Sequence, residues 1–221
     1  MNIAKKTIII LTSGGLDSST VAGLARSSKA KIYGLSFDYG QRHSKELEAA
    51  KRIAQYFKFE DFKIIKIDLS LWGGSSLTDK QKLIPNKGIN KNIIPNTYVP
   101  GRNTIFISVA LSYAEAINAD LIGIGVNALD YSGYPDCRPD YIEQFQRLAN
   151  LSNRRGRENN PIKLWTPLLD LNKEEIIEMA FDNNVPIEET WSCYEGGSKP
   201  CEKCDSCRIR IKAYKNWLSN K

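Results

Sequence analysis

The chain has 221 residues, of which 42% are hydrophobic and 25% are charged, so we expect one soluble globular core with at most a small appendage. Its net charge of +6 fits a nucleotide and an acidic substrate, and it is weak evidence for RNA because no block of like charges occurs. No apolar run approaches the roughly 20 residues that cross a membrane, and no signal peptide precedes the first predicted strand. We therefore expect a cytoplasmic protein without membrane or direct nucleic-acid partners.

The first predicted strand, residues 7–12, leads directly into a glycine loop, Ser-Gly-Gly-Leu-Asp-Ser at positions 13–18, and then into a helix. The strand is a continuous apolar and β-branched run, which is typical of a buried strand in a parallel sheet. A strand, a tight turn and a helix start aim backbone N–H groups and the positive end of a helix dipole at one point. Glycines let an anion approach this backbone closely, so the loop predicts a phosphate site.

The loop lacks the lysine of the Walker pattern and is not a GxGxxG loop either. An ordinary βα turn, capped by Ser or Asp, is the plainer alternative. The loop resembles the SGGxDS signature of the PP-loop ATP pyrophosphatases. That resemblance implies ATP binding, cleavage between the α and β phosphates, and activation of a substrate as its adenylate. The ATP-binding residues that it predicts are Thr12, Ser13, Gly14, Gly15, Leu16, Asp17, Ser18, Ser19, Thr20, Val21 and Ala22.

Two further strands follow, at residues 31–37 and 62–67, with an amphipathic helix between them. This spacing predicts a doubly wound, Rossmann-like parallel sheet of the α/β class with flanking helices. Ligands of such sheets bind beyond the carboxyl ends of the strands. The glycine loop and the loop at residues 38–43 both lie at that edge.

Residues 70–101 interrupt the alternation, and we interpret them either as a flexible cover near the active site or as simple disorder. Helices and strands resume afterwards. We predict a helix over 103–118, a strand over 120–126, a loop over 127–139, a helix over 140–153, a turn or linker over 153–160, a short strand over 162–164 and a helix over 172–182 that Asn172 caps.

Four of the five cysteines form the pattern C-x7-C-x2-C-x2-C, at Cys193, Cys201, Cys204 and Cys207. Disulfides are improbable in a cytoplasmic chain. Four thiolates with no spare ligand describe a closed structural zinc site; an iron–sulfur cluster is the alternative that also uses four cysteines. The metal would fix the amphipathic helix that starts near Cys207. We predict an ATP-binding domain over residues 1–170 and a helical, zinc-binding segment over residues 171–221, as one continuous structural unit.

With the loop and the cysteines considered together, the chain resembles the QueC (ExsB) family of queuosine biosynthesis over nearly its whole length. The segments that carry the resemblance are 13–18, 37–43, 99–103, 130–138, 166–168 and the four cysteines. It implies a carbon–nitrogen ligase that converts 7-carboxy-7-deazaguanine, ammonia and ATP, used with Mg²⁺, into 7-cyano-7-deazaguanine. It also implies a homodimer with one structural zinc per chain.

The resemblance and the residue types suggest roles for individual side chains. The predicted catalytic residues are Ser13 and Asp17 in the loop, Arg102 and His43. Asp17 would position Mg²⁺ or cap a helix; Arg102 would contact phosphate or the substrate carboxylate, or lie on the surface. Cys137 is a packing or pocket residue unless its pKa is lowered. The predicted substrate-binding residues are Asp38, Gln41, Arg42, Asp130, Tyr134, Asp136 and Arg138.

Two other functions fit parts of the pattern. A PP-loop enzyme that modifies tRNA would share the loop, but it would be expected to carry an RNA-binding appendage and a catalytic cysteine pair. A zinc-stabilised binding module or nucleotide sensor would bind ATP without turnover. Because Asp17 is present, the SGGxDS signature is intact, which favours an enzyme.

Overall fold

The structure is a computed structural model that describes residues 1–86, 93–127 and 133–220. In this part of the chain, five parallel strands form one sheet in the order β3-β2-β1-β4-β5. The strands are β1 (Thr7–Leu11), β2 (Lys31–Asp38), β3 (Asp61–Lys66), β4 (Leu121–Gly123) and β5 (Lys163–Trp165). The order reverses beside β1, so the predicted doubly wound α/β fold is confirmed.

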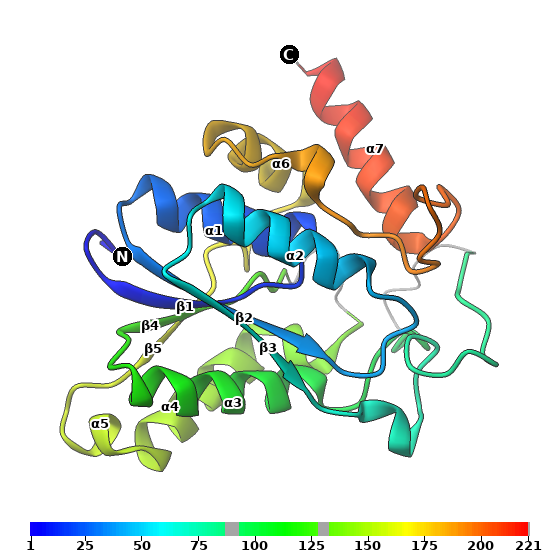
Figure 1. The fold of residues 1–221 in the computed structure, drawn as a ribbon. Coiled ribbons are helices and arrows are strands. Elements are labelled where there is room, and N and C mark those ends of the chain that lie inside the picture. Colours follow the sequence, from blue (N-terminus) through cyan, green and yellow to red (C-terminus); the bar gives the residue numbers. More distant parts are fainter. Residues whose placement is uncertain (87–92, 128–132, 221) are drawn as a thin grey trace.

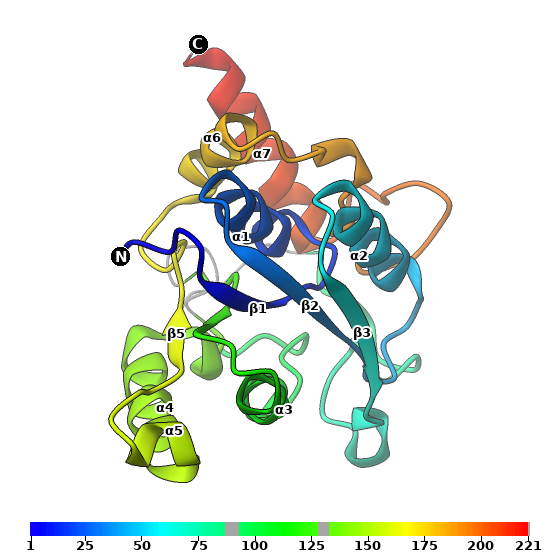
Figure 2. The ribbon, with the colours of Figure 1, turned by 60° about the vertical axis from the view of Figure 1, so that its left-hand side comes forward.

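Helices cover both faces of the sheet (Figure 1). Helices α1 and α2 lie on one face and α3 and α4 on the other, while α6 and α7 lie outside α1 (Figure 2). The helices are α1 (Leu16–Ser27), α2 (Lys45–Tyr56), α3 (Arg102–Ala116), α4 (Pro139–Ser152), α5 (Arg154–Arg157), α6 (Lys173–Asp182) and α7 (Asp205–Ser219). Short 3-10 turns occur at Leu69–Trp72, Pro135–Cys137 and Ile187–Glu189.

The buried strand β1 divides the core into two layers. Ile9 packs with Leu35 and Ile122 on the α3 side, whereas its neighbours Ile8 and Ile10 pack on the α1 side. All three isoleucines are fully buried. The alternation follows from the two-residue period of a strand, and it explains why β1 is apolar at four successive positions, from Ile8 to Leu11.

The C-terminal helices share the core of α1. Ile176, Ile177 and Ala180 of α6 are buried in the same hydrophobic cluster as Val21. The rings of Phe181 and Trp217 stack with centroids 4.3 Å apart, which fixes α7 against α6.

Helix α6 begins as predicted. The Asn172 side chain accepts a hydrogen bond from the backbone N–H of Glu175, and the Glu175 carboxylate accepts one from the backbone of Asn172. This capping box satisfies two of the N–H groups at the helix start. It also fixes where Lys173, the first residue of the helix, lies.

Three segments differ from their sequence-based descriptions. The strand predicted over 120–126 pairs only at Leu121–Gly123, after which the chain leaves the sheet and lines a cavity. The turn predicted over 153–160 contains the short helix α5, where Arg155 is buried and donates to the carbonyl of Asn160. Within the described parts of residues 70–101, Ser75, Ser76 and Thr97 are buried, so these parts pack against the domain.

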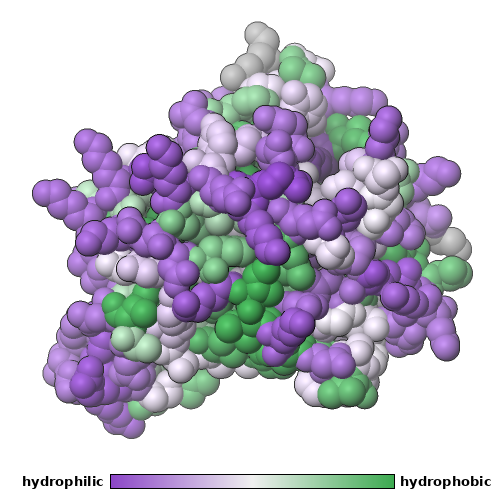
Figure 3. Space-filling view, viewed as in Figure 1, coloured by the Kyte–Doolittle hydropathy of each residue, from purple (hydrophilic) through white to green (hydrophobic). Residues whose placement is uncertain are grey.

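The face shown in Figure 3 is mainly hydrophilic, with hydrophobic residues gathered over α3 and β3. Partly buried side chains here include Ile65 of β3, Ile67 just after β3, and Ile105 and Val109 of α3. Among the described residues, no helix combines the length and the apolar character needed to cross a membrane.

Candidate active site and metal centre

A cavity of about 270 Å³ lies at the carboxyl ends of β1, β2 and β4, which is the edge where ligands bind in doubly wound sheets. The glycine loop forms one side of it, and the start of α3 forms another. The wall is completed by the cysteine segment, residues 191–207, through positions 191, 192 and 194, and by α7 through Ser206 and Ile209. Elements from both ends of the chain therefore build one site.

The predicted phosphate loop has its hydroxyl groups directed at one another. The Oγ atoms of Ser13 and Ser18 lie 3.0 Å apart, and Ser18 Oγ donates to the carbonyl of Gly15. Of the eleven predicted ATP-binding residues, the cavity lining includes Thr12, Ser13, Gly15, Leu16, Asp17 and Ser18. The other five are buried: Gly14, Ser19, Thr20, Val21 and Ala22.

Gly14 is required by a close approach between the loop and α2. Its φ angle is +81°, and a Cβ atom built on it would lie 2.4 Å from the carbonyl oxygen of Glu46 and 2.5 Å from the amide nitrogen of Ala50. A residue other than glycine is strained at this φ, and the neighbouring atoms leave no space for a Cβ atom. The loop is thus held against the first turns of α2.

We expect Gly14→Ala to destabilise the protein by about 2–4 kcal/mol, since strain and overpacking add, and to weaken ATP binding. Gly73→Ala is the matched control, because Gly73 also has a positive φ of +62° but nothing lies within 4 Å of its Cβ position. Thermal melts and ATP titrations would test this. Equal effects of the two substitutions would contradict the assigned close approach.

A buried ion pair lies at the base of the loop. The Nζ atom of Lys173 donates to both carboxylate oxygens of Asp17, at 2.8 and 2.9 Å. Only 8% of the Lys173 side chain and 24% of the Asp17 side chain are exposed. The pair connects the first turn of α1 to the first turn of α6, and both residues line the cavity.

Facing the loop is a polar and aromatic cluster on and around α3. The Arg102 guanidinium lies over the ring of Tyr39, 5.7 Å from its centroid. The Tyr134 hydroxyl is hydrogen bonded to Thr97 at 2.7 Å. The rings of Phe37 and Phe106 stack with centroids 3.8 Å apart. These side chains give the cavity one cation, several hydroxyl groups and flat apolar surfaces.

Burial sets the protonation of this cluster. It raises the pKa of Tyr39 to about 12 and, together with the nearby Asp136 carboxylate, raises the pKa of the Cys137 thiol to about 12. Cys137 lines the cavity, and its sulfur accepts a hydrogen bond from Asn103 at 3.2 Å. A thiol that stays protonated at neutral pH is a poor nucleophile, which supports the description of Cys137 as a pocket residue.

The structure places the predicted substrate residues in different surroundings. Gln41 lines the cavity, and its side chain bonds the backbone of Tyr39 and Phe37. Tyr134 lines it as well. Asp136 is buried. Its carboxylate accepts a hydrogen bond from the backbone N–H of Asn103, and burial raises its pKa. Their roles in substrate binding stay predictions.

Three other predicted substrate residues lie elsewhere. Arg42 donates to the backbone carbonyls of Ser76 and Asp79 and so holds that segment. Arg138 is exposed, 3.5 Å from Asp140. Asp38 ends β2. Asp130 lies outside the described residues.

His43, predicted as a catalytic residue, lies against the cysteine segment. Its Nε2 atom is 3.0 Å from the carbonyl oxygen of Cys193, which also accepts a hydrogen bond from the Trp191 indole. Its ring packs on Gly196, where a Cβ would come within 2.4 Å of three of its atoms. Burial lowers the pKa of His43, so a neutral imidazole joins the segment before α2 to the cysteine loop.

Several cavity residues were not predicted from the sequence, namely Tyr39, Glu46, Lys173, Trp191 and Tyr194. Tyr39 and Glu46 belong to or closely follow the segment 37–43, so their position at a strand end was a usable signal. Lys173 had no such signal, because nothing in its local sequence distinguishes it from an exposed lysine.

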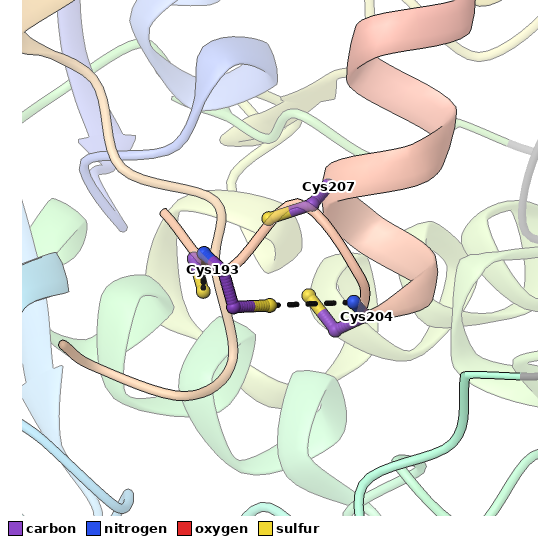
Figure 4. A group of neighbouring side chains, drawn as sticks. Cys193, Cys204 and Cys207 are labelled. Atoms are coloured by element: carbon purple, nitrogen blue, oxygen red, sulfur yellow. Dashed lines mark hydrogen bonds between the residues drawn. The ribbon is translucent and has the colours of Figure 1, made fainter. Parts of the chain in front are cut away.

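The four predicted metal ligands converge. The sulfur atoms of Cys193, Cys201, Cys204 and Cys207 all lie within 4.8 Å of one another. Figure 4 shows Cys204 and Cys207 at the start of α7 and Cys193 on the loop beside them. Tetrahedral thiolates at about 2.3 Å from zinc would be about 3.8 Å apart, so the arrangement fits a bound zinc ion after a small contraction.

Backbone N–H groups support the thiolate form of two of these cysteines, Cys193 and Cys201. The Cys193 sulfur accepts from the amides of Glu195 and Cys201, at 3.4 and 3.3 Å. The Cys201 sulfur accepts from Lys203 and Cys204. Burial acts to raise the pKa of Cys201, but these amides outweigh it and lower the pKa to about 7. Burial raises the pKa of Cys204 and Cys207. Together the four sulfur atoms offer the ligand set of a closed metal site.

A glycine loop of the SGGxDS kind at the end of β1, in a doubly wound parallel sheet with a four-cysteine centre beside the cavity, defines a PP-loop type of nucleotide-binding α/β protein. The sequence profile described as "Queuosine biosynthesis protein QueC" matches residues 7–218. The chain therefore belongs to the QueC family.

Relatives agree with this assignment, and a solved structure shares the fold alone. The chain is 75% identical over 221 residues, covering 100% of this chain and 99% of the relative, to a 7-cyano-7-deazaguanine synthase from Prochlorococcus marinus strain MIT 9301. It has the same identity, with the same coverage, to the 7-cyano-7-deazaguanine synthase of Prochlorococcus marinus subsp. pastoris. NMN synthetase from Francisella tularensis has a similar fold, with a TM-score of 0.51 and 16% identity over 99% of this chain and 78% of that chain.

Proposed function

We propose that this chain is an ATP-dependent ligase that converts 7-carboxy-7-deazaguanine and ammonia into 7-cyano-7-deazaguanine through an adenylated intermediate. One observation carries the proposal: the SGGxDS loop and the cluster around Arg102 line the same cavity, in a chain that is 75% identical over its full length to a protein named for this synthase activity. The cavity thus brings a phosphate site, a cation and aromatic surfaces together.

The proposed reaction begins with ATP on the loop. Backbone N–H groups at the start of α1 and the Ser13 and Ser18 hydroxyls bind its phosphates. Arg102 holds the substrate carboxylate, whose oxygen attacks the α phosphorus and displaces pyrophosphate. Ammonia then attacks the acyl-adenylate to give the amide and AMP. A second ATP activates the amide oxygen with release of pyrophosphate, and the loss of two N–H protons as AMP leaves with that oxygen gives the nitrile.

Asp17 remains the proposed partner of the Mg²⁺ ion that accompanies ATP and screens the phosphate charge. Both of its oxygens accept hydrogen bonds from Lys173, and each oxygen keeps a second lone pair, so Asp17 can take this role with Lys173 in place. The Lys173 ammonium group lines the same cavity, where its positive charge would also favour the phosphates.

The four cysteines are proposed to bind one structural zinc ion per chain. They leave no open ligand position, so the metal would fix the cavity wall rather than take part in the reaction. Metal analysis and visible absorption of the purified protein test this. Zinc in a colourless protein is expected, whereas iron with charge-transfer bands would favour an iron–sulfur cluster.

The test of the activity is mass spectrometry after incubation with Mg-ATP, ammonium and 7-carboxy-7-deazaguanine. The nitrile, formed together with AMP and pyrophosphate, is the expected result. Hydrolysis of ATP with the acid left unchanged would keep the loop assignment and reject the substrate, and tRNA would be the next substrate to try. Tight ATP binding without turnover would favour a sensor.

The homodimer implied by the resemblance and the cytoplasmic location expected from the sequence are also part of the proposal. A molar mass in solution of twice the 24.9 kDa of the chain would support the dimer. We expect no direct nucleic-acid binding, since the net charge of +6 is a mild excess.

A further inference from the structure

Glu46 is an acidic residue of the cavity that the steps above do not use. It is the second residue of α2 and lines the cavity, and its backbone carbonyl lies against Gly14 of the phosphate loop. Its side chain is partly buried, and no hydrogen bond to its carboxylate is found among the described residues. A carboxylate that lines a cavity in this way keeps its lone pairs available to accept a proton from a bound ligand.

The surroundings of Glu46 contain few charges. Arg102 of α3 and the Tyr39 hydroxyl are the charged and titratable groups whose fields act on it most directly. Farther around the lining are Tyr134, Tyr194, Cys137 and the Asp17–Lys173 pair. Burial raises the pKa of Glu46 to about 7, against the opposing effect of Arg102. A proton acceptor is most effective when its pKa lies near the working pH.

We propose that Glu46 is a catalytic base that takes the proton from the attacking nitrogen as the amide forms. This inference rests on the proposed function. The lone pair of ammonia forms the C–N bond at the acyl-adenylate, and the C–O bond to AMP breaks with its electron pair on AMP. One N–H proton passes to the Glu46 carboxylate, so the products are the neutral amide, AMP and the protonated acid.

The chemistry requires such an acceptor. The nitrogen becomes strongly acidic as the C–N bond forms, and reversal by loss of ammonia competes until a proton is removed. Adenylation itself transfers no proton to this position. The role of Glu46 is therefore confined to the ammonia-dependent half of the reaction, and the two halves can be measured separately.

The test compares Glu46→Gln with the unchanged protein in two assays. Exchange of labelled pyrophosphate into ATP, dependent on 7-carboxy-7-deazaguanine and without ammonium, is expected to change by less than about threefold. Ammonia-dependent turnover is expected to fall by about 100-fold at pH 8. The turnover rate of the unchanged protein divided by that of Glu46→Gln should rise with pH through about 7 and then level off. The ionisation of ammonium affects both proteins equally and cancels in this ratio.

Glu48→Gln is the matched control, because Glu48 is an exposed carboxylate on the same helix; both assays should be unaffected. Equal loss of exchange and turnover in Glu46→Gln would show a positioning or structural role and overturn the proposal. A rate ratio that does not vary with pH would overturn it as well. Absence of exchange in the unchanged protein would instead reject the proposed function itself.

Discussion

Asp17→Asn is expected to lower the melting temperature by on the order of 10 °C and adenylation by at least about 100-fold. Removing one partner of a largely buried ion pair costs about 3–5 kcal/mol, and each kcal/mol shifts the midpoint of a domain of this size by about 2–4 °C. Lys173, whose side chain is only 8% exposed, loses the negative charge of the Asp17 carboxylate. The activity falls because the carboxylate proposed to position Mg²⁺ is lost.

The double variant Asp17→Asn/Lys173→Met separates these two effects. It removes both charges, so we expect most of the stability to return while adenylation stays low. Glu143→Gln is the control for an exposed pair, since Glu143 and Arg147 are 62% and 66% exposed, and its effect should stay below about 1 kcal/mol. Additive losses of stability in the double variant would contradict the coupling seen between Asp17 and Lys173.

Loss of the metal is expected to have the second large effect. Cys204→Ser, or removal of the metal with a chelator, should lower the melting temperature by on the order of 10 °C or more, because metal binding by four thiolates contributes folding free energy directly. Turnover should fall at temperatures where the protein is still folded. The cysteine segment supplies Trp191 and Tyr194 to the cavity wall, and α7 supplies Ser206 and Ile209.

Measuring the metal content of each variant together with its melting temperature shows whether a loss of stability comes from a loss of metal. Cys137→Ser should retain one metal ion per chain, since Cys137 lies outside the four-sulfur group. Restoring zinc to the chelated protein should restore both stability and turnover. A metal-free protein with unchanged melting and full activity would show that the cysteines neither bind a metal in the native state nor hold the cavity wall.

The fold and the two motifs could be predicted because their signals are local. β1 is apolar from Ile8 to Leu11 because both faces of the sheet are covered, and the glycine loop follows within two residues of it. The four cysteines lie within a single segment of the sequence, and their side chains converge as expected. Asn172 was recognisable as the helix cap because Glu175, its partner in the capping box, follows three residues later in the sequence.

The rest of the site depends on tertiary packing that no local pattern encodes. Lys173 meets Asp17 across 156 positions of sequence, only because α6 packs on α1. His43 was predicted as a catalytic residue; in the structure the cysteine loop folds onto it through Gly196, and its catalytic role stays a prediction. Arg138 follows a buried segment, yet its own side chain is exposed. The division at residue 170 stays a prediction.

The most direct test of the proposed adenylation follows the oxygen atoms of the substrate carboxylate. 7-Carboxy-7-deazaguanine labelled with heavy oxygen in its carboxylate is incubated with Mg-ATP and ammonium, and the nucleotide and phosphate products are analysed by mass spectrometry. Attack of the carboxylate on the α phosphorus predicts heavy oxygen in AMP, with unlabelled pyrophosphate. Heavy oxygen in inorganic phosphate, with ADP as the nucleotide product, would show an acyl phosphate and contradict cleavage between the α and β phosphates at this loop.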